Sequence, residues 1–193
     1  MTNITAIPYE EYFGAMPLTE EEKKRRIEFA KQMEELFIIL FVLMRQNNED
    51  YFDTSSVEQR LEDVLEDNNV TVTKTMATLI RERLEDIVAI TQRHTEDTYY
   101  TSDDRAKLLA EEETNTFLNR EEYDRAKSDG MTRKQWITMK DSKVRDTHER
   151  IDDAIIPIDE DFAVGGCMMA FPRDTKGDPN EIAGCRCGIK YLP

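Results

Sequence analysis

The fold is decided first by residues 19–48, which read TEEEKKRRIEFAKQMEELFIILFVLMRQNN. The opening threonine and the glutamate three positions later form a capping box, in which the hydroxyl accepts from a first-turn amide and the carboxylate reaches back. Apolar residues then recur at helical spacing, which predicts a helix of about seven turns that ends near Asn47 and Asn48. The members of this apolar stripe are Ile27, Ala30, Met33, Phe37, Leu40, Phe41 and Met44.

The segment from Leu36 to Met44 is apolar around the whole circumference of that predicted helix. A helix that is hydrophobic all round is buried on every side, and this run is about half the length that a bilayer-spanning helix needs. Two arrangements satisfy the pattern: the helix is the centre of a bundle, or its outer side packs against another protein chain. We expect the second.

Three further helices are predicted before residue 130, from helical periodicity and from their start and stop signals. They begin near Ser55, Thr75 and Asp103, and the last of them stops at Gly130. Residues 1–18 contain scattered aromatic residues and prolines but no helical or strand periodicity. Such a segment is typical of a terminal arm that either packs against another surface or frays. We therefore expect residues 1 to about 129 to be dominated by α-helix.

The composition changes after Gly130, where five of the seven glycines, all three cysteines and the only tryptophan lie. Short apolar pieces separated by turns predict short strands in this segment. The predicted fold class is α+β, with a mainly helical N-terminal two-thirds and a small, loop-rich C-terminal unit of short strands. We place the domain boundary between a helical region at 1–100 and a second domain at 101–193.

The charge balance limits the kinds of partner. The 193 residues include 26 Lys and Arg against 41 Asp and Glu, a formal net charge of −15. Such a surface disfavours nucleic acid and anionic membranes, which need clustered positive charge, and favours basic protein partners. Because residues 1–6 lack the pattern of a secretory signal, we expect folding in the cytoplasm, where thiols stay reduced.

The cysteines suggest a metal site. Cys185 and Cys187 are separated by one residue, too close for a relaxed disulfide between them. Together with Cys167 and His148 they supply three thiolates and one imidazole, the donors of a tetrahedral zinc site. The spacing is not that of a standard zinc finger, so buried reduced cysteines beside a hydrogen-bonded histidine remain the alternative. In either case we expect Cys185 and Cys187 to contact His148 and Trp136.

A catalytic interpretation rests on Arg145 and His148, with the histidine as general base and the arginine holding an anion. No nucleophile at a fixed spacing and no Gly-rich phosphate loop accompanies these two residues. A structural role, with His148 oriented by Asp146 or Asp152, fits the sequence better. We therefore expect no enzyme.

The segment from about Arg105 to Pro193 resembles the Mu protein F-like family, a phage head morphogenesis domain. The resemblance lies in the order and spacing of several short motifs, each of them weak alone. They are Glu113-Thr114-Asn115, Gly130, Lys134-Gln135-Trp136, Asp141 through Arg145 to His148, Phe162, Pro172-Arg173-Asp174 and Cys185-Arg186-Cys187.

This resemblance implies a structural minor head protein of a tailed bacteriophage, associated with the portal vertex or the head interior. Its implied partners are the portal and capsid proteins of the same phage, with self-association as a further option. It would occupy the host cytoplasm during assembly and then the virion, and some relatives leave the head with the genome. The alternatives are a small hydrolase or transferase centred on Arg145 and His148, and a protein-interaction module whose fold is stabilised by a structural zinc ion.

Overall fold

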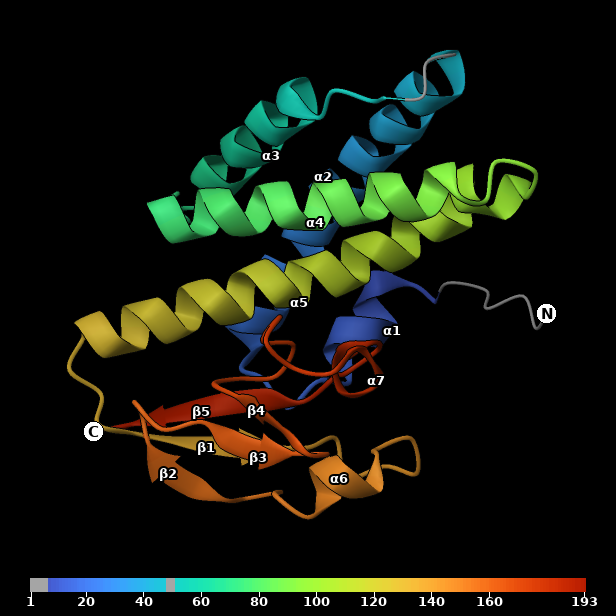
Figure 1. Ribbon diagram of the computed structural model, residues 1–193. Helices are drawn as coiled ribbons and strands as arrows, with labels where there is room; N and C mark the ends of the chain where they lie inside the picture. The colour runs from blue at the N-terminus through green and yellow to red at the C-terminus, as the bar shows by residue number, and fades with distance from the viewer. Residues whose placement is uncertain (1–6, 48–50) are drawn as a thin grey trace. The chain divides into compact units, whose positions relative to one another are not determined.

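The computed structural model describes residues 7–47 and 51–193 (Figure 1). Helices come first and short antiparallel strands follow, which confirms the predicted α+β class. Among the described residues no strand precedes Gly130. The N-terminal elements are α1 (Tyr9–Gly14), α2 (Glu20–Gln46), α3 (Ser55–Asp67), α4 (Lys74–Gln92), the 3-10 helix η1 (Thr98–Thr101) and α5 (Asp103–Ser128).

The C-terminal elements are shorter. They are β1 (Arg133–Ile137), α6 (Asp146–Glu149), β2 (Ile155–Pro157), β3 (Phe162–Val164), β4 (Cys167–Met169), α7 (Pro179–Ile182) and β5 (Gly188–Leu192). Two antiparallel sheets result, one of three strands in the order β2-β1-β5 and one hairpin of β3 and β4. In the larger sheet Trp136 pairs with Ile189, and Lys134 pairs with Tyr191.

The capping box at the start of α2 is present as predicted. The Thr19 amide donates to Glu22 Oε2 at 2.8 Å, and the Glu22 amide donates to Thr19 Oγ1 at 3.3 Å. From this cap α2 runs to Gln46, close to the predicted end. The helix end predicted near Asn47 and Asn48 is therefore found at Gln46, one residue before Asn47, while Asn48 lies outside the described residues.

The chain divides into two compact units. Unit 1 consists of Ile27–Thr114 with the described part of Met1–Tyr9, and unit 2 consists of Glu10–Arg26 and Asn115–Pro193. The helices α2 and α5 each contribute residues to both units. A single cut at residue 100 does not reproduce these units, because two helices of 27 and 26 residues extend through both. The domain boundary remains a prediction.

Unit 1 is built on the apolar stripe of α2. Leu36, Phe37, Leu40 and Phe41 are buried, and α3 and α4 add buried aliphatic side chains. On the opposite side of α2, Ile39 and Val42 are each 38% exposed. Packing within the described chain thus buries one side of the segment and leaves part of the other side accessible.

Unit 2 contains a small apolar cluster beside its sheets. Its buried members are Trp136, Phe162, Val164, Met169, Cys185 and Cys187. In the part of the N-terminal arm that belongs to this unit, Phe13 and Met16 are also buried. Gly188, directly after the second of these cysteines, allows the arm to approach: a Cβ there would lie 3.3 Å from Leu18 Cδ2. Residues 10–18 of the arm therefore pack within unit 2.

Candidate metal centre

Three buried side chains of unit 2 bring soft donor atoms together. His148 lies on α6, and Cys185 and Cys187 lie in the loop between α7 and β5. His148 Nδ1 is 3.4 Å from Cys187 Sγ and 3.6 Å from Cys185 Sγ. The Trp136 ring packs edge-on against the imidazole at a centroid distance of 5.5 Å. This confirms the predicted cluster of both cysteines with His148 and Trp136.

The other ring nitrogen of His148 contacts a carboxylate. His148 Nε2 is 3.1 Å from Glu181 Oε2, and the Thr147 hydroxyl donates to the same oxygen at 2.7 Å. Because an ionised carboxylate only accepts hydrogen bonds, Nε2 carries the proton, and in a neutral imidazole Nδ1 is left with a lone pair. That lone pair faces the two sulfur atoms.

The sequence did not identify Glu181. The carboxylate predicted to orient His148 was that of Asp146 or Asp152, and this prediction is wrong. Asp152 instead accepts from the Thr138 amide at 2.8 Å. Glu181 is placed by α7, a single turn whose N-cap Asp178 accepts from the Asn180 amide and whose first residue is proline. The Asp-Pro start of that turn is visible in the sequence. The contact itself is not, because Glu181 lies 33 residues after His148.

The two cysteines differ in proton affinity. A hydrogen bond from the Cys187 thiol, followed by the nearby His148, holds the pKa of Cys185 well below its usual range. The same interaction raises the pKa of Cys187. The thiolate is the form of cysteine that binds metals.

Cys167 lies outside the group of donor atoms. The donor atoms of His148, Cys185 and Cys187 lie within 4.8 Å of one another, and Cys167 is not among them. Its sulfur donates to the Val164 carbonyl at 2.9 Å and accepts from the Asp178 amide at 3.3 Å. In the tight β3–β4 hairpin, Cys167 is paired with Val164, the same residue whose carbonyl accepts from its thiol. The predicted four-ligand set is therefore not assembled, and the structure brings three of its members together.

Two arginines hold the backbone that leads into the cysteines. Arg145 donates to the carbonyls of Glu181 and Ala183, and Arg173 donates to the carbonyl between them, that of Ile182, at 2.9 Å. Charge-assisted hydrogen bonds of this kind are stronger than neutral ones. The guanidinium of Arg145 therefore fixes the chain itself, whereas the catalytic interpretation required it to hold an anion.

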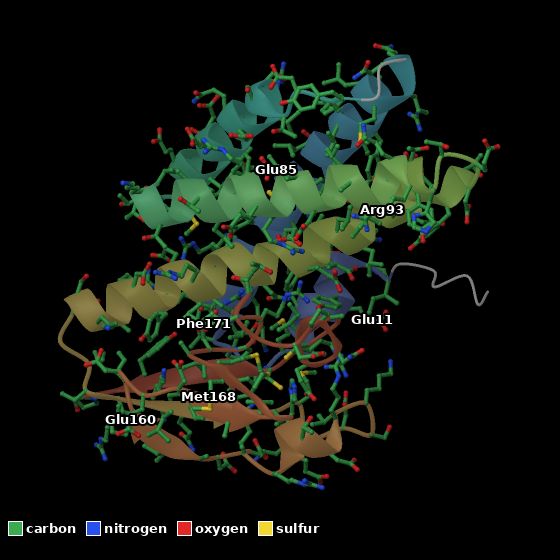
Figure 2. All side chains as sticks on the ribbon, viewed as in Figure 1. Glu11, Glu85, Arg93, Glu160, Met168 and Phe171 are labelled. Carbon is green, nitrogen blue, oxygen red and sulfur yellow. The ribbon has the colours of Figure 1, made fainter. Side chains whose placement is uncertain are left out.

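The Arg173 turn is attached to α5. Arg173 Nε donates to Thr116 Oγ1 at 3.2 Å, and the Asn119 amide donates to the Pro172 carbonyl at 2.6 Å. Phe171, labelled in Figure 2, is buried with its ring 5.2 Å from that of Tyr123. The Arg173 side chain and the Pro172 carbonyl thus connect α5 to the segment that carries the cysteines.

A small cavity opens beside the donor atoms. It has a volume of about 20 Å³ and is lined by His148, both cysteines and three basic side chains, those of Lys143, Arg145 and Arg186. A space of this size holds about one water molecule. Arg186, the residue between the cysteines, is itself held by Asp141 at 2.8 Å.

The comparison with protein families agrees with the motifs. Residues 71–190, well over half of the chain, match the family described as Phage Mu protein F like protein. No curated protein and no solved structure matches the chain. Among the described helices, none is both long enough and apolar enough to cross a membrane. The chain belongs to the Phage Mu protein F like family, which confirms the resemblance and points to bacteriophage head morphogenesis.

Proposed function

We propose that this family member is a structural minor head protein of a tailed bacteriophage, located at the portal vertex or in the head interior. Its partners would be the portal and capsid proteins of the same phage, first in the host cytoplasm and then in the virion. The observation that carries the proposal is the family match over residues 71–190. That match includes every motif residue that builds unit 2.

The contacts of those motif residues support a structural role. His148 is 1% exposed, and both of its ring nitrogens contact side chains of its own chain. Arg145 binds backbone carbonyls, and Arg186 binds Asp141. A general base needs hydrogen-bond access to a substrate proton. The side chains on which the enzyme alternative depends are thus engaged in holding unit 2 together.

The surface of unit 1 offers a means of association. Ile39 and Val42 lie on α2 and are each 38% exposed, in a chain with a formal net charge of −15. Apolar side chains in an acidic surface favour a partner that has an apolar contact area bordered by basic residues. We propose that a portal or capsid subunit supplies this surface, and that a second copy of the chain is the alternative occupant.

The proposal is tested by assembling heads with and without the portal protein in cells that express a tagged form of this chain. We expect the tagged chain to sediment with portal-containing heads in few copies, and to be depleted from heads without a portal if the vertex is its location. Equal amounts in both kinds of head would place it in the interior. Absence from both would contradict the proposal.

The His148→Ala variant separates this function from the enzyme alternative. In a structural protein the substitution lowers stability and head incorporation together, whereas an enzyme would assemble normally and lose a later step. Release with the genome is tested by asking whether the tagged chain leaves purified virions when DNA ejection is triggered.

A further inference from the structure

We propose that His148 Nδ1, Cys185 Sγ and Cys187 Sγ bind one Zn²⁺ ion. Glu181 would position the histidine, and Cys167 would not be a ligand. The inference concerns the chemistry of unit 2 and does not depend on the role of the chain in the phage head. It rests on the positions of the donor atoms, on the carboxylate behind the histidine and on the adjacent cavity.

The donor atoms already have the spacing of a zinc tetrahedron. Zn–N bonds of about 2.0–2.1 Å and Zn–S bonds of about 2.3 Å place nitrogen and sulfur roughly 3.6 Å apart at a tetrahedral angle. The observed separations from His148 Nδ1 are 3.4 Å to Cys187 and 3.6 Å to Cys185. Little rearrangement is needed to place an ion between the three atoms.

The number of sulfur atoms at this nitrogen favours a metal over a hydrogen bond. The Nδ1 atom of a neutral histidine has one lone pair, which accepts one proton. Two sulfur atoms lie at nearly equal distances from it, so without a metal one S–H···N hydrogen bond accounts for one sulfur, and the other is held only by the hydrogen bond between the two cysteines. A cation at the centre interacts with all three atoms.

Glu181 contacts the ring nitrogen of His148 that would not bind the metal, as expected for a metal-binding histidine. Metal-bound histidines usually donate their other ring N–H to a carboxylate or a carbonyl, which fixes the tautomer and the orientation of the ring. Here Glu181 Oε2 accepts from Nε2 at 3.1 Å and is itself held by the Thr147 hydroxyl at 2.7 Å. Because Glu181 accepts from both Thr147 and His148 Nε2, the other ring nitrogen, Nδ1, is left as the ligand atom.

The charges of the site also fit a divalent cation. Two thiolates buried side by side repel each other and are costly, and one Zn²⁺ neutralises both. The indole Nε1 of Trp136 is buried, and no described oxygen or nitrogen atom accepts its N–H. Its ring packs in the same cluster as both cysteines. A metal-bound thiolate at Cys187 would be a better acceptor for that N–H than a neutral thiol.

The fourth coordination position is assigned to water. The cavity of about 20 Å³ beside the donor atoms has room for about one molecule. Cys167 is held elsewhere by Val164 and Asp178. The ligand set is therefore two thiolates, one imidazole and one water. Thiolate ligands select zinc and other soft ions over magnesium or calcium.

The test uses the whole chain, purified under reducing conditions and freed of metal with a chelator. Co²⁺ is then titrated as a spectroscopic probe for zinc. We expect one Co²⁺ per chain with thiolate-to-cobalt charge-transfer absorption, displacement by one equivalent of Zn²⁺, and a higher Tm for the zinc-loaded chain. These readouts on the unmodified chain do not require any variant to fold.

Single substitutions then identify the ligands. Cys185→Ser and Cys187→Ser should each halve the charge-transfer intensity and weaken Co²⁺ binding at least a hundredfold. Cys167→Ser is the matched control and should leave intensity and affinity unchanged. Glu181→Gln should preserve the spectrum while weakening binding roughly 10–100-fold, the usual cost of removing a carboxylate behind a ligating histidine.

Three results would overturn the inference. The first is a reduced wild-type chain that binds neither Co²⁺ nor Zn²⁺ at micromolar concentration. The second is binding without charge-transfer absorption, which would place the ion on surface carboxylates. The third is a Cys167→Ser variant that loses the metal as completely as Cys185→Ser does.

Discussion

In unit 1, the buried side chains of α2, α3 and α4 are nearly all aliphatic or aromatic, and its buried charged side chains, Arg105, Glu111 and Glu113, all lie on α5. Unit 2 buries Arg26, Lys134 and Arg173 beside its apolar cluster. Arg26 donates to Asn115, Asn119 and Glu122, and Arg173 donates to Thr116 and a backbone carbonyl. Apolar packing is non-directional and tolerates adjustment. Buried polar groups require particular partners. The two units should therefore respond differently to substitution, pH and metal.

The largest expected effect is in the apolar interior of unit 1. Phe37 on α2 is 1% exposed, and Phe37→Ala should lower the free energy of unfolding by roughly 3–5 kcal/mol, because it removes buried area and leaves a cavity. Urea unfolding measures this loss. Ile39→Ala on the same helix is the control and should stay within about 1 kcal/mol. Hydrogen exchange should rise first in α3 and α4. An equal rise in β1 and β5 would show that the two units unfold as one.

In unit 2 the corresponding substitution removes a charge. Arg26 is fully buried and pairs with Glu122 at 2.7 Å. Arg26→Ala leaves that carboxylate buried without its cation, so the free energy of unfolding should fall by about 3 kcal/mol, the lower end of the range for broken buried pairs. Lys23→Ala breaks the exposed pair with Glu20 on the same helix and should cost less than about 1 kcal/mol. Similar losses for the two variants would show that the buried pair does not contribute specifically to unit 2.

A second buried cation in unit 2 predicts a dependence on pH. Burial lowers the pKa of Lys134 from 10.5 to about 8, and among the described residues its ammonium has no hydrogen-bond partner. Between about pH 8 and 10.5 the unfolded chain binds this proton and the folded chain does not, so stability rises with pH through that window. Lys134→Met should therefore stabilise the chain by up to about 3 kcal/mol at pH 7. The gain should vanish near pH 10.5. A gain that stays constant with pH would show that packing is its cause.

Unit 1 contains a carboxyl group with the opposite pH dependence. Burial raises the pKa of Glu111 from 4.5 to about 7. Because the folded chain binds this proton more tightly, its contribution to stability is lost as pH rises from about 4.5 to 7. Glu111→Gln should stabilise the chain by up to about 3 kcal/mol at pH 8 and have little effect at pH 4.5. Thermal melts of both variants across pH test whether the two slopes have opposite signs.

The units also differ in how far the sequence predicts them. The spacing of Phe37, Leu40 and Phe41 and the cap at Thr19 are local patterns, and they located α2 to within a residue or two. In unit 2 the sequence indicated that His148 and the two nearby cysteines cluster, because a small unit has few large or soft side chains with which to form a centre. It grouped Cys167 with them as a metal ligand, whereas the structure packs Cys167 against the cluster without bringing its sulfur to the other donor atoms, and it missed Glu181. The positions of Cys167 and Glu181 are set by a hairpin and by a single helical turn, and neither element has a periodic sequence pattern that would reveal it.

The smallest expected effect on stability concerns Ile39 and Val42 of α2, each 38% exposed. Because these side chains remain partly in water in the folded chain, the double variant Ile39→Ser and Val42→Ser should change the free energy of unfolding by no more than about 1 kcal/mol. If the exposed side of α2 is the contact with a portal or capsid subunit, the same variant should lose head association, since apolar anchors at the centre of an interface carry much of its binding energy. Sedimentation of the variant with assembled heads measures that loss.

Replacing Glu35, another exposed α2 residue, by Gln is the matched control and should associate normally. A double variant that is stable and still associates fully would show that the apolar run of α2 serves only the interior of unit 1.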